Sequence, residues 1–166
     1  MAAGTLISIA EYLSTSYSPD CDYVDGVLVE RNVGERDHSS VQGLLVGYLV
    51  NRRKEWRIHV FPEQRVQIKP NRFRVPDVCV MAGAEPEEQI LTTPPVVCIE
   101  ILSKDDRWSQ MQEKIDDYLS FGVRHVWVID PRSRKAYEFT VAGMHEVREL
   151  RTQSPEIVVP LEALFE

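Results

Sequence analysis

The chain has 166 residues, of which 43% are hydrophobic and 27% are charged, a balance typical of a soluble domain with a sizeable core. A net charge of -7 disfavours binding of polyanions over the whole surface. No run approaches the ~20 apolar residues of a membrane helix, and the start of the chain lacks the pattern of a signal peptide. We therefore expect a cytoplasmic protein with no membrane partner, folded as a single domain over residues 1–166.

The three cysteines carry no metal signature. Cys21, Cys79 and Cys98 form no CxxC pair and no zinc spacing. Two of them lie in apolar, strand-like runs, where free cysteine behaves as a small hydrophobe. This pattern favours a reduced compartment.

Residues 1–35 predict a short helix followed by a β-hairpin. Ser8 and Glu11 form a capping box for a helix that ends near Ser14. Asp25-Gly26 separates two apolar runs at 22–24 and 27–29, which is a strong signal for a two-residue hairpin turn.

Residues 36–131 predict the core of the fold. The expected elements, in chain order, are a helix at 38–56 capped by Asp37, strands at 59–69 and 74–81, a polar connection at 82–95, a strand at 96–103, a helix from Trp108 to Gly122 and a strand at 124–130. The order helix, strand, strand, strand, helix, strand predicts an α/β fold (α+β mixed) with a mixed central sheet. In residues 132–166 we expect short strands at 136–140 and 146–150, and a tail at 157–161 packed on the sheet edge.

Two isolated carboxylates stand inside apolar runs of this core. Asp77 follows Val75 and Pro76 in the predicted strand 74–81, and Glu100 lies within 96–103. A bare carboxylate among apolar neighbours is costly unless it is paired or holds a metal. Magnesium binds through one or two carboxylates together with waters and phosphate oxygens, so two acids on neighbouring strands suffice for a site. The alternatives are a hydrogen-bonded turn aspartate and a buried glutamate paired with an arginine.

Several motifs resemble a known family in their order and spacing. The matching pieces are residues 22–26, Phe61-Pro62-Glu63, Val75-Pro76-Asp77-Val78, residues 99–103, Lys114 with Tyr118, and Gly122-Val123 leading to residues 127–131. Together they resemble the PD-(D/E)XK nuclease superfamily, and within it the Uma-two family of restriction-endonuclease-like proteins. The resemblance covers most of the chain and implies a restriction-endonuclease-like core.

The resemblance implies a magnesium site, with manganese as a possible substitute, held by Asp77 and Glu100 and completed by the main-chain oxygen of Ile101. In the superfamily a lysine lies two residues after the second acid, but here that position is Leu102. The family resemblance implies a lysine displaced to the following helix, and Lys114 matches it. Helical spacing places Lys114 at the border of the apolar stripe, where a surface lysine is the alternative.

Other candidates are weaker. Lys104, four residues beyond Glu100, is a rival to Lys114. Asp22 occupies a position where the family usually has glutamate, and it is either a third acid or a hairpin residue. His38 also matches a family position and could contact phosphate or orient a ligand; the alternative is a surface histidine. We therefore take Asp77, Glu100, Lys114, His38 and Asp22 as the candidate catalytic residues.

Basic side chains are concentrated in two segments, which could contact phosphates or be solvated helix ends and turns. They are Arg52, Arg53, Lys54 and Arg57 in the first, and Lys69, Arg72 and Arg74 in the second. The predicted activity is metal-dependent hydrolysis of nucleic acid, with DNA as the expected partner. The alternatives are a catalytically degenerate binding or dimerisation module, motivated by Leu102, and a hydrolase of small phosphoesters. By analogy with small nucleases of this fold, we expect a homodimer.

Overall fold

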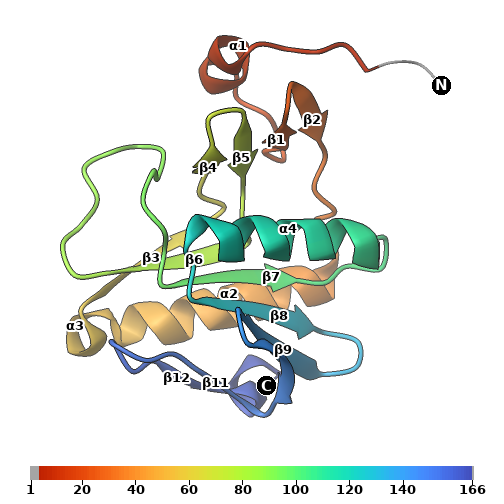
Figure 1. Cartoon of the computed structure of the whole chain (residues 1–166). Helices are drawn as coiled ribbons and strands as arrows, with labels where there is room; N and C mark the ends of the chain where they lie inside the picture. Colours follow the sequence, from red (N-terminus) through yellow and green to blue (C-terminus); the bar gives the residue numbers. More distant parts are fainter. Residues whose placement is uncertain (1–3, 166) are drawn as a thin grey trace.

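The computed structural model describes residues 4–165 and is built around a six-stranded mixed sheet (Figure 1). The strand order is β10-β9-β8-β7-β6-β3. The strands are β3 (Ile58–Pro62), β6 (Val78–Ala82), β7 (Val97–Ile101), β8 (His125–Asp130), β9 (Lys135–Thr140) and β10 (Gly143–Val147). Only β7 and β8 run parallel, and the other neighbours are antiparallel. The predicted mixed sheet is thus confirmed.

Two helices cover opposite faces of this sheet (Figure 1). Helix α2 (Arg36–Asn51) packs Leu45 and Leu49 against the face that carries Ile99. Helix α4 (Trp108–Phe121) packs Ile115 and Tyr118 against the face that carries Cys98. Because side chains alternate along a strand, Glu100 lies on the same face as Cys98, beneath α4.

A second, smaller sheet stands beside the first in the order β2-β1-β5-β4. It contains β1 (Asp22–Val24), β2 (Val27–Val29), β4 (Val66–Lys69) and β5 (Arg72–Arg74). Helix α1 (Ile9–Ser14) covers it through a small aromatic core of Tyr12, Tyr23 and Phe73. This sheet brings β1 and β5 close to the main sheet, which matters for the site.

Three local predictions are confirmed. The Ser8 hydroxyl accepts a hydrogen bond from the Glu11 N–H and caps α1. Asp25 and Gly26 both have positive φ angles, 51° and 93°, as a tight hairpin turn between β1 and β2 requires. Gly122 ends α4 in the left-handed conformation, at φ 112°.

Two predicted strands are each broken in two. The stretch 59–69 forms β3 and β4, and the chain turns between them at Glu63, whose φ is 51°. The stretch 74–81 forms the end of β5 and then β6, separated by Val75, Pro76 and Asp77. Proline has no N–H for a sheet ladder, so Pro76 interrupts the pairing where the chain crosses from the small sheet to the large one.

The ends of other elements also differ from prediction. The helix predicted at 38–56 divides at Arg52 into α2 and the short α3 (Arg53–Trp56). Glu35, rather than Asp37, is the residue before its first turn. The predicted strand at 146–150 is replaced by the end of β10 and by β11 (Glu149–Arg151).

The C-terminal tail does not join the edge of the main sheet. Strand β12 (Val158–Pro160) pairs with β11 in a separate two-stranded sheet, and the 3-10 helix η1 (Leu161–Leu164) contacts α2. The cysteines at 21, 79 and 98 are buried and free. Within residues 4–165, no helix combines the length and apolarity needed to span a membrane.

Candidate active site

The two predicted acids lie next to each other at one end of strands β6 and β7. Val78 is paired with Ile99, so Asp77 and Glu100 follow at the next position of the antiparallel pair. The Ile101 N–H donates a 2.7 Å hydrogen bond to Oδ2 of Asp77, which holds Asp77 against the end of β7. Both acids are buried, Asp77 at 3% and Glu100 at 2% exposure. Because the strand is interrupted at Pro76, Asp77 lies beside the end of β7.

Asp77 is surrounded by cationic side chains from two segments. Arg31, in the connection between β2 and α2, donates from Nη2 to Oδ1 at 2.7 Å. Nε2 of His38, in the first turn of α2, lies 3.2 Å from Oδ2. Burial acts to raise the pKa of Asp77, but the contact with His38 and the charges of His38 and Arg31 outweigh it and hold the pKa below its usual range. Asp77 is therefore ionised in the folded protein.

His38 is buried rather than exposed, contrary to the surface alternative. Burial acts to lower the pKa of His38, but the contact with the carboxylate of Asp77 outweighs it and raises the pKa. The charge of Arg31 opposes that rise. His38, in α2, thus contacts Asp77 and helps to lower the pKa of that carboxyl group.

Glu100 is held by two residues of α4. The Tyr118 hydroxyl donates to Oε1 at 2.6 Å, and Lys114 Nζ lies 3.3 Å from Oε2. Burial raises the pKa of Glu100 to about 7, the charge of Lys114 opposes this rise, and the charge of Asp77 adds to it. Near neutral pH, Glu100 therefore exchanges between its protonated and ionised forms.

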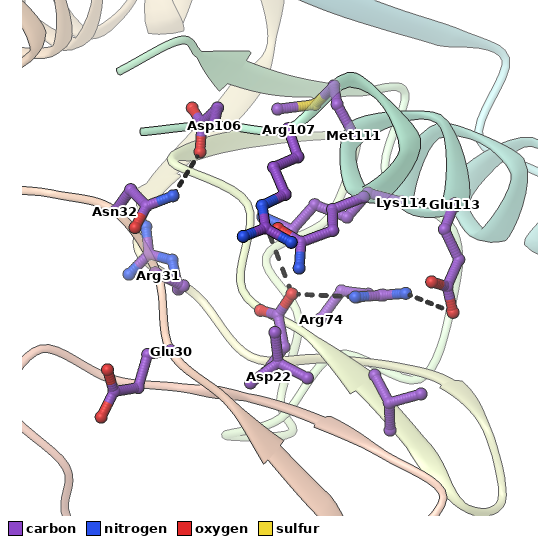
Figure 2. Close-up of a pocket in the computed structure, with 13 residues that line it drawn as sticks. Asp22, Glu30, Arg31, Asn32, Arg74, Asp106, Arg107, Met111, Glu113 and Lys114 are labelled. Carbon is purple, nitrogen blue, oxygen red and sulfur yellow. Dashed lines mark hydrogen bonds and ion pairs between the residues drawn. The ribbon is translucent and has the colours of Figure 1, made fainter. Parts of the chain in front are cut away.

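Lys114 lies between Glu100 and the third acid, Asp22. Figure 2 shows Lys114 beside Asp22. Lys114 Nζ lies 3.6 Å from Oδ2 of Asp22, and Arg74 Nη1 donates to the same oxygen at 3.1 Å. The Val75 N–H donates to Oδ1 of Asp22 at 2.8 Å. Burial acts to lower the pKa of Lys114, but the charges of the neighbouring acids outweigh it and raise the pKa. Lys114 is therefore protonated at neutral pH.

A cavity of about 120 Å³ opens beside this cluster (Figure 2). Asp22, Arg31, Arg74 and Lys114 are among the residues that line it. Glu30, Asp106 and Glu113 line it as well, so acidic and basic side chains share the wall of this cavity.

The donor chemistry at Asp77 and Glu100 fits a hard divalent cation. The charge of Asp77 helps to raise the pKa of Glu100, which is the repulsion that a cation bound between two acids relieves. Two carboxylates, waters and phosphate oxygens are a sufficient ligand set for magnesium. Within residues 4–165, no group of three or more His, Cys, Asp or Glu side chains is arranged to hold a metal. Asp22 lies across Lys114 from Glu100.

The other sequence candidates lie as follows. Lys104 is exposed and donates its main-chain N–H to Glu35, so the structure brings Lys114, not Lys104, to Glu100. Leu102, at the usual lysine position, packs in the apolar cluster beneath α4. The Glu63 carboxylate is half-exposed and lies 4.0 Å from Arg31 Nη1.

Neither basic segment of the sequence lies free beside the two acids. The basic cluster at Arg52–Arg57 directly precedes β3, which begins at Ile58. Ile58 is paired with Ala82, at the end of β6 that is far from Asp77. Arg72 and Arg74 are committed to ion pairs with Asp25, Asp117 and Asp22. These two arginines stabilise the contact between the small sheet and α4.

Sequence reasoning missed Arg31, and it named Arg74 only as part of a basic segment that could contact phosphates, not as a partner of Asp22. Arg31 contacts an acid 46 residues away, and Arg74 contacts one 52 residues away. Neither pair has a helical or strand spacing, so the sequence offers no local signal for them. Pro76 was the one usable sign that the chain breaks near Asp77.

Comparison with known proteins agrees with this architecture. A solved structure described as a putative nuclease belonging to DUF820 from Anabaena variabilis ATCC 29413 superposes with a TM-score of 0.80. It is 22% identical in sequence and the match covers 96% of this chain and 97% of the other. No curated protein matches the chain. The model of the Uma-two family, described as "Putative restriction endonuclease", matches residues 9–166, and the chain belongs to that family.

Proposed function

We propose that the protein is a metal-dependent endonuclease that hydrolyses phosphodiester bonds of nucleic acid, with DNA as the substrate. The observation that carries this proposal is the pair of buried acids, Asp77 and Glu100, with Lys114 Nζ 3.3 Å from Glu100 Oε2. Membership of the Uma-two family supports the same reaction class.

Asp77 and Glu100 would hold the divalent cation, with magnesium or manganese as the expected ion and the main-chain oxygen of Ile101 as a further ligand. A cation bound there supplies Lewis-acid polarisation of the scissile phosphate and lowers the pKa of water. Arg31 and His38 keep Asp77 ionised, and Tyr118 fixes one oxygen of Glu100 so that the other faces Lys114. The residues thus prepare two oriented carboxylates.

Lys114 would stabilise the negative charge that develops on the phosphate. Because the acids raise its pKa, Lys114 stays protonated and acts as a hydrogen-bond donor rather than as a base. Its position between Glu100 and Asp22 holds the ammonium group at the cavity. This arrangement supplies from α4 the charge that the usual lysine position, Leu102, lacks.

Lys114→Met is expected to reduce the cleavage rate by roughly 10²- to 10³-fold, because one preorganised charge at the reacting phosphate is lost. The test is single-turnover cleavage of plasmid, linear duplex, single-stranded RNA and a mononucleotide ester, each with Mg²⁺, Mn²⁺ or a chelator. Lys54→Met, on α3, is the matched control and should cleave as the wild type does. Activity in the chelator, or an unaffected Lys114→Met, would contradict the proposal. Turnover of the mononucleotide alone would favour a small-phosphoester hydrolase.

An arginine surface at the same end of the sheet suits the backbone of the substrate. Arg36, Arg132 and Arg134 are exposed and line a cavity of about 350 Å³. Arg36 lies two residues before His38. Arg132 and Arg134 follow the end of β8, where Ile129 is paired with Ile101, the residue that contacts Asp77. We define these three residues as the arginine surface. Asp37, which is ion-paired with Arg36, lines the same cavity, and the three arginines still leave it with a local excess of positive charge for phosphates.

Changing the arginine surface to glutamine at all three positions is expected to weaken duplex binding and to lower the salt dependence of log Kd by about 2–3 units of slope. Fluorescence anisotropy at several salt concentrations measures both quantities. The same change at Arg53, Lys54 and Arg57, which lie at the other end of the sheet, is the charge-matched control. Equal losses in the two triple variants would show that only net charge matters. Sedimentation of the free protein tests the proposed homodimer separately.

A further inference from the structure

A buried arginine is hydrogen-bonded to one of the two acids of the site. The Arg31 side chain is 3% exposed, and its Nη2 donates to Asp77 Oδ1 at 2.7 Å. Arginine stays protonated in proteins, so this charge cannot be removed by proton loss. A cation that binds Asp77 therefore meets a fixed positive charge on the same carboxylate.

The second terminal nitrogen of Arg31 has no acceptor. Nη1 is buried and makes no hydrogen bond within residues 4–165; its nearest ion-pair partner, Oε1 of Glu63, is 4.0 Å away. A buried donor without an acceptor is costly to the folded state. Arg31 and Lys114 both line the 120 Å³ cavity, so a group bound there lies beside both side chains, and Nη1 becomes accessible to it when the guanidinium moves away from Asp77.

We propose that Arg31 is a resident counter-ion of Asp77 that a divalent cation displaces, and that the displaced guanidinium binds an oxygen of the substrate phosphate. This inference rests on the proposed function. Both steps follow from charge: a guanidinium and a divalent cation repel each other at one carboxylate, and the fork of an arginine matches phosphate oxygens. Arg31 lowers the affinity for the cation in the absence of substrate and raises the affinity for substrate once the cation is bound.

Arg31→Gln removes the competing charge and tests the first step without any activity measurement. Mn²⁺ alone is added, and the free ion is counted by electron paramagnetic resonance. Arg31→Gln is expected to bind Mn²⁺ about tenfold more tightly than the wild type, in the range of ordinary coupling between two ligands. The control, Arg65→Gln, breaks an equally short arginine–aspartate pair with Asp20 and should leave Mn²⁺ affinity unchanged. Arg31→Lys keeps the charge, so it should bind Mn²⁺ as weakly as the wild type.

The second step is tested by duplex affinity in saturating Mn²⁺, with Lys114→Met present in every variant to suppress cleavage. Adding Arg31→Gln is expected to weaken duplex binding about tenfold, which corresponds to the loss of one strong phosphate contact. Equal or weaker Mn²⁺ binding by Arg31→Gln overturns the proposal, and so does an unchanged duplex affinity. If neither the wild type nor Arg31→Gln binds Mn²⁺, the proposed function itself fails at its cation site, and displacement fails with it.

Discussion

Asp77→Asn is expected to lower the rate of metal-dependent cleavage by roughly a thousandfold or more, equivalent to about 4 kcal/mol of transition-state stabilisation. The substitution keeps the size of the side chain but removes the charge that would hold the cation. One oxygen remains to accept the Ile101 N–H or the Arg31 guanidinium, so the end of β7 keeps part of its support. Single-turnover cleavage at saturating Mg²⁺ measures the effect.

The matched control for this variant is Asp20→Asn. Asp20 also accepts two short hydrogen bonds from an arginine, Arg65, but outside the site. Both variants lose an arginine–aspartate ion pair, so a general loss of stability affects both. Cleavage by Asp77→Asn at the rate of Asp20→Asn would contradict the role assigned to Asp77.

Glu100→Gln is expected to stabilise the cation-free protein at pH 8 while it reduces cleavage. Burial raises the pKa of Glu100 from 4.5 to about 7 in the folded state. Folding therefore favours the protonated form: this stabilisation is fully present below pH 4.5 and is lost as the pH rises to about 7. Glutamine stays neutral at every pH, so the variant avoids this loss, which amounts to roughly 3 kcal/mol at pH 8. The Tyr118 hydroxyl can donate to the amide oxygen as it does to Oε1.

Urea unfolding of the wild type and Glu100→Gln at pH 5, 6 and 8, all in a chelator, measures this difference. The gap in free energy of unfolding should grow with pH in favour of the variant. Glu146→Gln, on the exposed edge strand β10, should show no such growth. A constant gap for Glu100→Gln would mean that Glu100 is ionised throughout this range. We expect Glu100→Gln to be more stable and less active than the wild type. This combination would mean that burial of the Glu100 carboxylate destabilises the folded protein but is needed for cleavage.

The order of elements was predictable because it depends on the periodicity of apolar residues and on the turn residues that end each apolar run. Asp25-Gly26 and Gly122 each ended an apolar run with the residue that the local backbone requires, and both predictions held. The broken strands were missed because alternation of side chains continues through Glu63 and through residues 75–77. Only the crossing between two sheets, a tertiary feature, separates β3 from β4 and β5 from β6.

The site was predictable in part and for a different reason. Asp77 and Glu100 drew attention as charges in apolar runs, while Lys114 was selected through the family resemblance. The geometry brings all three together. Arg31 lies in an irregular connection, and its partner is far away in sequence, so no pattern indicated it. Its guanidinium is buried, as is that of Arg74, and this burial is visible only in the folded structure.

The most direct test of the account is a calorimetric titration of Mn²⁺ into the wild type and into the double variant Asp77→Asn/Glu100→Gln, without nucleic acid. The account predicts binding to the wild type and none to the double variant, with circular dichroism showing both folded. Equal binding by the two proteins would place the cation elsewhere. A wild type that binds no Mn²⁺ would contradict the two-carboxylate cation site, and with it the proposed mechanism.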